Sequence, residues 1–267
     1  MPTAIAQESA SHHTASIQEA AYSRSMQDNA PRSPLCAMLT DDPDDLRKIY
    51  ALRYRVFAEE MGASIEEGMD KDKFDDVCHH LVVKDEDTDE VVGYSRIITN
   101  DAAAQVGGFY TQTEFDLSQV LKPSKTYMEI GRTCVAPGFR SGAVIALLWA
   151  RLGQFMMENN IDYLMGCASI PMSEGGAQAM AVINYLRQKH FVDTDSRVSP
   201  KHPLPILETK LNGKEFVPAL LKAYLRIGCK VCGEPHWDKD FNVADVVVLL
   251  DRTKINMRYL KHFLRAA

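Results

Sequence analysis

The chain has 267 residues, of which 46% are hydrophobic and 25% charged, a composition typical of soluble globular proteins. Its formal net charge of -6 argues against a general nucleic-acid-binding protein. The six cysteines have no regular spacing, and the sequence shows neither an apolar leader nor a long apolar run, which predicts reduced thiols and a cytoplasmic location.

The N-terminal segment, residues 1–37, is rich in Ala, Ser, Gln and His and has few aromatic or branched apolar residues. Such a segment buries too little apolar surface to offset the entropy that it loses on ordering. We therefore predict a disordered tail, followed by one folded domain at residues 38–267.

The folded domain is predicted to open with a helix at Asp42 and Pro43, an N-cap followed by proline at the first helical position. Apolar residues recur at helical spacing as far as Met61 and define one buried face. Arg53 lies on that face, four residues before Phe57. An arginine in such a place is expected to reach carboxylates.

An acidic loop from Asp70 to Asp76 supplies candidate carboxylates, among them Asp72 and Asp75. The loop lacks the glycine and the closing glutamate of a calcium-binding loop, so no metal site is predicted there. We interpret these aspartates as partners for arginine.

Two strands joined by an acidic turn are predicted next, at residues 79–83 and 91–98. In the second strand Arg96 shares a face with apolar residues, as alternation along a strand requires. Two arginines on apolar faces are harder to explain as solvated charges than one.

A central strand is predicted at residues 126–135, and it carries Glu129 and Arg132. Gly131 between them permits a β-bulge, which would bring both side chains to one side of the strand. A charged pair in an apolar sheet is costly unless it is paired or used, so we interpret it as the floor of an active site. A structural ion pair or a solvated strand face is the alternative.

The remaining elements alternate between helices and strands. Residues 100–125 form a connecting region without a clear pattern, and a proline-rich loop covers residues 200–205. The order of elements predicts a mixed α/β fold with one central sheet flanked by helices. The predicted helices are 141–160, 173–190, 218–227 and a basic one at 253–264; the predicted strands are 161–169, 228–232 and 243–250.

Cys229 and Cys232 have the spacing of a zinc or redox pair, but no second pair exists and they lie in a strand-like run. We interpret them as core cysteines. Nucleophile elbows, phosphate-binding loops and dinucleotide fingerprints are absent from the sequence. The sequence therefore indicates acid/base and electrostatic chemistry by Glu, Asp and Arg.

The strand that begins at Glu129, the turn after it and the next helix resemble the GCN5-related N-acyltransferase (GNAT) fold. The resemblance implies that the strand parts from its neighbour to admit a pantetheine arm and that the turn and helix N-terminus receive its phosphate. The glycine-rich turn of acetyl-coenzyme A enzymes is reduced here to Arg140-Ser-Gly-Ala-Val-Ile, which weakens coenzyme A as the expected donor. The implied donor-binding residues are Cys134, Val135, Arg140 and Gly142.

Four spaced motifs resemble the acyl-homoserine-lactone synthases, which take acyl chains from acyl carrier protein: Arg53-x-x-x-Phe57, Asp72-x-x-Asp75, Gly93-x-x-Arg96 and Glu129-x-x-Arg132. The tryptophan that this family places after the phenylalanine is absent. Over nearly all of its ordered part, the chain also resembles the ornithine Nα-acyltransferases of ornithine-lipid synthesis. These enzymes are also labelled hemolysin-like proteins. Residues 52–62, 129–135, 166–169 and 232–245 carry this resemblance.

The resemblance to the ornithine Nα-acyltransferases implies transfer of a (3-hydroxy)acyl chain from the thioester of acyl carrier protein to the α-amine of L-ornithine, giving lyso-ornithine lipid. It implies no cofactor of the enzyme's own and no metal. Glu129 is expected to act as the base, directly or through water, and Arg132 to act beside it. The expected acceptor-binding residues are Arg53, Phe57, Asp72, Asp75 and Arg96.

Two alternatives stay open: a synthase of another N-acyl amino acid or of an acyl-homoserine lactone, and a non-catalytic module that binds acyl carrier protein or membrane. The basic C-terminal helix is the feature that a non-catalytic binding module would use. Its residues Lys254, Arg258, Lys261 and Arg265 are candidates to engage the carrier or the anionic inner membrane, at about 1 kcal/mol per basic residue. A helix packed on the domain with a solvated basic face is the simpler interpretation.

Overall fold

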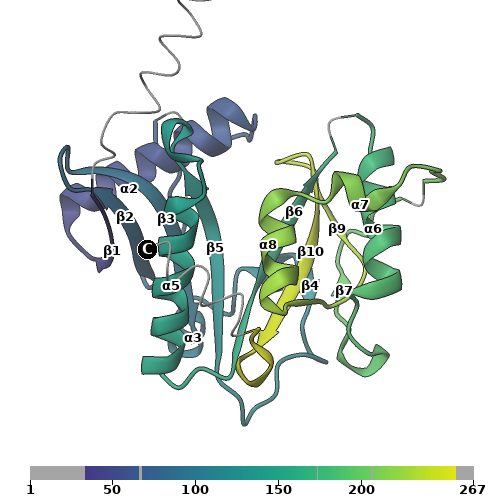
Figure 1. The fold of residues 1–267 in the computed structure, drawn as a ribbon. Helices are drawn as coiled ribbons and strands as arrows, with labels where there is room; N and C mark the ends of the chain where they lie inside the picture. Colours follow the sequence, from purple (N-terminus) through teal and green to yellow (C-terminus); the bar gives the residue numbers. More distant parts are fainter. Residues whose placement is uncertain (1–33, 66–67, 173, 206, 257–267) are drawn as a thin grey trace, which may run out of the picture. The chain divides into compact units, whose positions relative to one another are not determined.

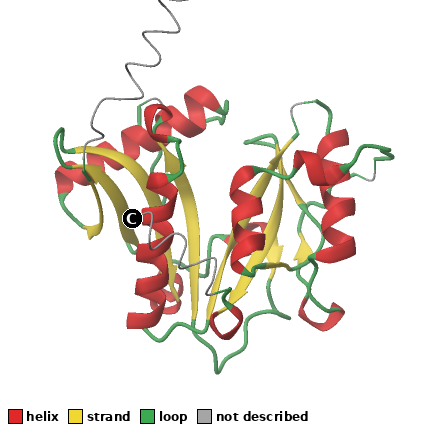
Figure 2. Cartoon of the chain, in the orientation of Figure 1, coloured by secondary structure: helices red, strands yellow, loops and turns green. Residues whose placement is uncertain are grey.

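The computed structural model describes residues 34–65, 68–172, 174–205 and 207–256. They form an eight-stranded mixed sheet flanked by helices (Figures 1 and 2), which confirms the predicted fold class. Along the sheet the order is β1-β2-β3-β5-β6-β10-β8, with β9 also paired to β10; β4 and β7 make a separate two-stranded sheet. The strands are β1 (Leu35–Thr40), β2 (His79–Asp85), β3 (Glu90–Thr99), β4 (Phe115–Asp116), β5 (Tyr127–Val135), β6 (Tyr163–Pro171), β7 (Ser199–Pro200), β8 (Lys230–Val231), β9 (His236–Asp238) and β10 (Val243–Asp251).

The helices pack against this sheet, with α2 touching β3 and β5, and α5 lying across β1, β2 and β3. Three-residue 3-10 helices, labelled η, occur at residues 137–139, 194–196 and 252–254. The segment η1 is π-helical and continues α2. The helices are α2 (Pro43–Tyr54), η1 (Arg55–Glu60), α3 (Asn100–Gln105), α4 (Thr111–Glu114), η2 (Pro137–Phe139), α5 (Ala143–Glu158), α6 (Ala177–Lys189), η3 (Thr194–Ser196), α7 (Gly213–Phe216), α8 (Ala219–Ile227) and η4 (Arg252–Lys254).

Both faces of the central strands are buried, because successive side chains of a strand point to opposite faces and each face has its own apolar cluster. The larger cluster takes Met128, Leu164 and Val246, and their sequence neighbours Tyr127, Met165 and Val247 belong to the smaller one. Charged side chains in the middle of these strands, such as those of Glu129 and Asp245, are therefore buried.

The folded domain begins earlier than predicted, and its first helix has the predicted N-cap. β1 begins at Leu35 and pairs with β2, so residues 35–37, which we assigned to the tail, belong to the sheet. Residues 1–33 lie outside the described part of the chain. The Asp42 carboxylate accepts hydrogen bonds from two backbone N–H groups of the first turn of α2, as predicted for an N-cap.

The predicted hairpin and bulge are both present. β2 and β3 pair antiparallel, and β3 pairs in turn with β5. Between Tyr94 and Arg96 of β3, β5 advances by three residues, from Gly131 to Cys134, which is a bulge of one residue. The residue with left-handed backbone is Arg132, with φ of 51°, and not the glycine that we expected to permit the bulge.

The strands β5 and β6 separate close to the bulge. The two strands are parallel and pair only from Tyr127 to Glu129, whereas β6 stays paired with β10 along its whole length. Where the strands separate, a Cβ on Gly166 would overlap the carbonyl oxygen of Ile130. The glycine therefore allows β5 and β6 to approach closely at this point.

The C-terminal half confirms the predicted strand 243–250 and the helix 218–227. Cys229 and Cys232 are buried free thiols, as expected of core cysteines. The helix predicted from Thr253 does not begin there, because η4 ends at Lys254 and Ile255, with ψ of 129°, is not helical. Residues 257–264 of that prediction lie outside the described part. Within the described ranges, no helix combines the length and the apolar content that crossing a bilayer demands.

Candidate active site

Three arginines and three aspartates form a closed ring of ion pairs at the β3–β5 bulge. Each arginine bridges two aspartates, and each aspartate bridges two arginines. In order, the ring runs Arg53, Asp70, Arg132, Asp72, Arg96, Asp75 and back to Arg53. The six N···O distances along that path are 2.9, 3.1, 3.4, 2.6, 3.2 and 2.6 Å.

The formal charges of this arginine–aspartate ring cancel, which is what allows it to be buried. The side chains of Arg53 and Asp75 are fully buried and that of Arg96 is 1% exposed. Burial alone would raise the pKa of Asp75, but Arg53 and Arg96 hold it below its ordinary value. The structure thus brings together all five charged residues expected beside the strand, and adds Asp70.

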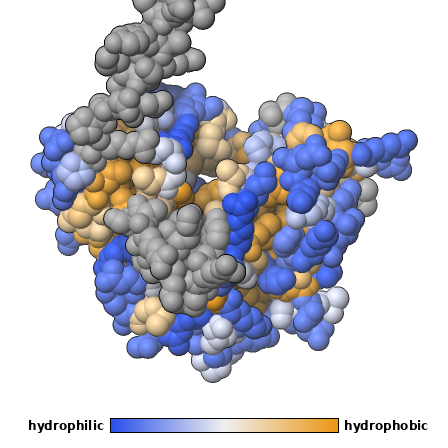
Figure 3. All heavy atoms as spheres, viewed as in Figure 1, coloured by the Kyte–Doolittle hydropathy of each residue, from blue (hydrophilic) through white to orange (hydrophobic). Residues whose placement is uncertain are grey.

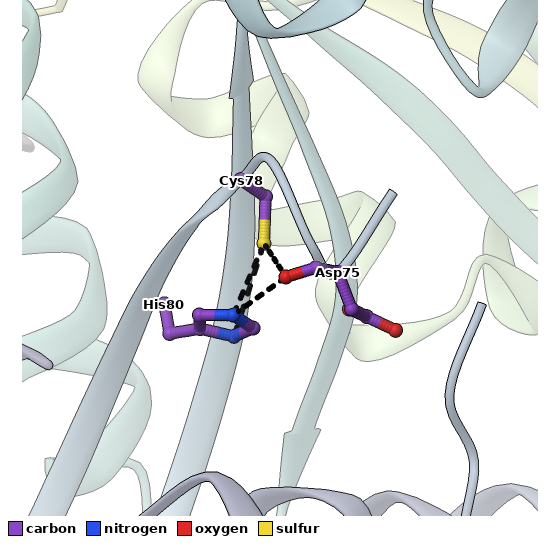
Figure 4. A group of neighbouring side chains, drawn as sticks. All are labelled: Asp75, Cys78 and His80. Atoms are coloured by element: carbon purple, nitrogen blue, oxygen red, sulfur yellow. Dashed lines mark hydrogen bonds between the residues drawn. The ribbon is translucent and has the colours of Figure 1, made fainter. Parts of the chain in front are cut away.

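The loop that carries the aspartates is fixed from behind by Cys78 and His80 (Figure 4). Nε2 of the His80 ring lies 3.0 Å from the backbone carbonyl oxygen of Asp75, and the Cys78 thiol donates to the same oxygen at 3.8 Å. Burial raises the pKa of Cys78 to about 12 and lowers that of His80, so a neutral thiol and a neutral imidazole are favoured. These groups anchor Asp75 in the ring.

A cavity of about 250 Å³ opens beside the ring, between β5 and β6 where the strands have parted. The space-filling view in Figure 3 shows a hollow between the part of the domain around β5 and the part around α8, with apolar residues at its sides. Arg96 and Arg132 line one part of the cavity, and Asp238 and Asp245 another. Apolar walls come from Phe57, Met61, Ile130, Leu220, Leu221, Tyr224, Phe241 and Val243.

Phe57 was expected in the acceptor site and does line the cavity. Its ring lies 5.9 Å from the guanidinium carbon of Arg132 and 6.3 Å from the ring of Phe241. Arg132 also lies 5.2 Å from the ring of Tyr110, so aromatic faces surround this arginine. Its Nε is 3.1 Å from Asp70 but lacks the alignment of a hydrogen bond.

Glu129 lies behind the cavity and not among the residues that line it. Its carboxylate accepts hydrogen bonds from the backbone N–H groups of Tyr110 and Thr111, each at 2.7 Å, and from the Thr111 hydroxyl. Burial raises the pKa of Glu129, and these donors limit the rise. The carboxylate holds the start of α4 against β5, and the base role predicted for it stays a prediction.

The four residues expected to bind the donor follow the bulge in sequence. Cys134 is buried, and Val135 is half-buried and accepts a hydrogen bond from Arg140 Nε at 3.0 Å. Arg140 also pairs with Glu60 at 2.8 Å and is largely exposed. Gly142 has φ of 102° and precedes α5, whose first N–H groups receive no side-chain cap. Their roles stay predictions.

A cluster that sequence reasoning missed lies on the far side of the cavity. Glu114, Asp238 and Asp245, here called the acid corner, each place an oxygen within 4.8 Å of the others. Burial and mutual repulsion raise the pKa of Glu114 to about 8; burial first, and then Asp238, raises that of Asp245 to about 6. Among the ion pairs of the described ranges, none involves these three carboxylates.

A signal for Asp245 was present in the sequence. It is the one charged residue in the apolar run Val243–Leu250, in the middle of a predicted strand. That is the same argument that singled out Glu129 in its own strand. Asp238 lies in residues 232–245, one of the segments that carry the family resemblance, but no periodicity singled it out. Glu114 lies in a segment without a clear pattern.

Comparison with solved structures supports the fold. An N-acyl amino acid synthase from uncultured soil microbes, FeeM, superposes with a TM-score of 0.53 at 12% identity, covering 86% of this chain and 98% of that one. The acyl-homoserine lactone synthase LasI gives a TM-score of 0.53 at 13% identity, covering 86% of this chain and 96% of that one. At these identities the likeness concerns the fold alone.

Comparison of sequences goes further. Residues 52–150 match the model of a family described as an acetyltransferase (GNAT) domain. An L-ornithine Nα-acyltransferase of Rhizobium meliloti is 32% identical over 80% of this chain and 78% of that protein, and one of Rhodobacter capsulatus is 30% identical over 85% and 93%. The chain is an acyltransferase of GNAT fold and belongs to the L-ornithine Nα-acyltransferase family.

Proposed function

We propose that this enzyme transfers a long acyl chain, typically 3-hydroxylated, from the thioester of acyl carrier protein to the α-amine of L-ornithine, giving lyso-ornithine lipid. The observation that carries the proposal is the similarity, over most of both chains, to proteins named L-ornithine Nα-acyltransferase. The cavity beside the arginine–aspartate ring supports it, because it combines groups of both charges with apolar walls.

The acceptor has one carboxylate and two ammonium groups, so its site needs both signs of charge. Arg132 lines the cavity, its side chain is 15% exposed, and arginine suits bidentate binding of a carboxylate. Asp238 lines the same cavity and suits an ammonium group. Arg53, Asp72, Asp75 and Arg96 would hold Arg132 in place through the ring.

The donor would enter where β5 and β6 part. The N–H groups at the start of α5, which no side chain caps, suit a phosphate, and Arg140 would add a positive charge once it leaves Glu60. The turn before α5 lacks the glycine-rich pattern expected for coenzyme A, which favours a carrier protein as donor. Lys254 is an exposed basic residue for carrier or membrane contact; Arg258, Lys261 and Arg265 lie outside the described part.

For this reaction the protein has to position the two substrates, transfer a proton and stabilise charge. A thioester is already activated, so the enzyme has to deprotonate the ammonium, bring the nitrogen to the carbonyl carbon and stabilise the oxyanion. The proposal includes no covalent enzyme intermediate and no resident cofactor. The phosphopantetheine of the carrier belongs to the substrate.

The test is mass spectrometry of products formed by the purified enzyme with a mixture of amino acids. One arm supplies 3-hydroxyacyl carrier protein and the other supplies the matching acyl-coenzyme A. We expect N-acylornithine from the carrier-protein arm in large excess. Acylation of a different amine would make the enzyme another N-acyl amino acid synthase, and no transfer in either arm would contradict the proposal as a whole.

A further inference from the structure

We propose that Asp245 is the proton acceptor of the transfer reaction and that Ser169 positions its carboxylate. This inference rests on the proposed function and deepens it, since it names the residue that converts the bound ammonium into a nucleophilic amine.

The geometry places Asp245 in the wall of the cavity. It lies in β10 directly opposite Ser169 of β6, and both residues line the cavity. The Ser169 hydroxyl donates a hydrogen bond of 2.6 Å to Oδ1 of Asp245. Oδ2 is thus left to receive a proton from a molecule in the cavity. The two strands are paired on both sides of this point, so the carboxylate has little freedom to move.

Glu129 has a less suitable place. Both of its oxygens already accept hydrogen bonds from Tyr110 or Thr111, and it does not line the cavity. Glu129 is 2% exposed, so an amine bound in the cavity has no direct contact with its carboxylate. A base must lie within hydrogen-bond reach of the proton or be connected to it by one water.

The charges around Asp245 suit a base that works near neutral pH. Asp238 of β9 repels its negative charge, while Arg132 of β5 attracts it and Ser169 donates to it. Glu114 of α4 faces the same carboxylate, and the charge of Asp245 helps to raise the pKa of Glu114 to about 8. Cys167 of β6 lies beside Glu114 and donates to it. Burial and repulsion raise the pKa of Asp245 to about 6, so it is ionised at pH 7 and is a stronger base than an exposed aspartate.

The α-ammonium of the acceptor gives one proton to Asp245, and the neutral nitrogen attacks the thioester carbonyl carbon. The N–C bond forms and the C–S bond breaks, with the nitrogen losing its second proton to the departing sulfur. The products are the amide and the free thiol of the donor, and Asp245 returns its proton to water.

The experiment measures kcat and kcat/KM for N-acylornithine formation from pH 5 to pH 9 with four variants. Asp245→Asn removes the acceptor with little change of shape, Ser169→Ala removes its hydrogen bond, and Glu129→Gln tests the competing base. Asp251→Asn is the matched control, because Asp251 lies on the same strand and on the same side but outside the cavity. Folding is checked for each variant by circular dichroism.

For the wild type and Asp251→Asn, we expect kcat to fall on the acid side with a midpoint near pH 6. Asp245→Asn should lose about 10²–10⁴-fold in kcat and lose this acid limb, with the KM for the donor nearly unchanged. Ser169→Ala should move the limb to higher pH and recover activity there, because the hydrogen bond holds the pKa down. Glu129→Gln should keep the limb.

Two results would overturn the inference: an Asp245→Asn enzyme that keeps the acid limb, whatever its rate, or loss of that limb in Glu129→Gln alone. Either result would leave the proposed function standing, since the wild type would still form N-acylornithine. Failure of the wild type to do so would contradict the proposed function instead.

Discussion

The cavity has charged groups on two sides, and the two sides differ in how their charge is balanced. In the arginine–aspartate ring, three cations and three anions alternate, and each residue has two partners of opposite charge. In the acid corner, three carboxylates lie together, and groups that donate hydrogen bonds to them, the side chains of Ser169 and Cys167 and two backbone N–H groups at residues 240–241, are neutral. The two sides therefore respond to protons in opposite ways.

Arginine holds the pKa of Asp75 below its ordinary value, whereas burial and repulsion raise the pKa of Glu114 and Asp245 above theirs. Asp75 thus keeps its charge across the physiological range, and the ring serves as a rigid support. The acid corner changes its charge near neutral pH, which is what proton transfer requires. We infer that the ring positions the substrate and that the corner carries the chemistry.

The largest expected effect comes from opening the ring. Arg53→Met should lower the free energy of unfolding by about 3–5 kcal/mol, because Asp70 and Asp75 would each lose a buried partner. Urea denaturation measures it. Arg47→Ala is the control, since Arg47 pairs with Asp44 on the surface and should cost about 0–1 kcal/mol. Equal effects of the two substitutions would show that the ring is no more than surface charge.

The acid corner should respond with the opposite sign. The raised pKa of Asp245 means that the folded state binds more protons than the unfolded state between about pH 4 and pH 6, so stability falls as the pH rises through this range. Asp245→Asn should thus stabilise the protein at pH 8 by up to about 3 kcal/mol and have little effect at pH 4. Thermal unfolding at both values measures this, and a destabilised variant at pH 8 would contradict it.

Glu129→Gln separates a structural carboxylate from a reactive one. The glutamine amide would face the N–H groups of Tyr110 or Thr111, leaving a buried donor without an acceptor, at a cost of about 1–3 kcal/mol. Chemical denaturation compared with Glu129→Ala gives the measurement. No loss of stability in the glutamine variant would show that these hydrogen bonds matter little.

Arg140→Ala should have the smallest effect on stability, about 0–1 kcal/mol, because its pair with Glu60 is exposed. If Arg140 meets the donor phosphate, the KM for acyl carrier protein should rise and become less dependent on salt. Steady-state kinetics at several ionic strengths test this. Arg151→Ala, farther along α5, is the control and should behave as the wild type.

The sequence predicted one side of the cavity well and the other hardly at all. Arg53 and Arg96 lie on apolar faces of regular elements, so periodicity alone marked them as buried charges in need of partners. The acid corner combines Glu114 of a four-residue helix, Asp238 of a three-residue strand and Asp245 of a long strand. Only tertiary contacts bring such segments together, and short elements have too little periodicity to be recognised.

The bulge shows the same limit on a smaller scale. Gly131 predicted an irregularity at the correct place, but the left-handed backbone belongs to Arg132, because ion pairs and aromatic contacts hold that side chain. Likewise Glu129 was recognised as a buried charge. Its donors lie in residues 110–111, in the region where the sequence had no readable pattern.

The most direct test of the contrast between ring and corner is a carbon-13 NMR titration of the Asp and Glu carboxyl groups from pH 3 to pH 9. Asp75→Asn, Glu114→Gln and Asp245→Asn would assign the three resonances. We expect Asp245 to titrate with a midpoint near 6 and Glu114 near 8, while Asp75 stays ionised to below its ordinary pKa. Midpoints near 4 for both residues of the corner would contradict the division between a fixed support and a reactive side.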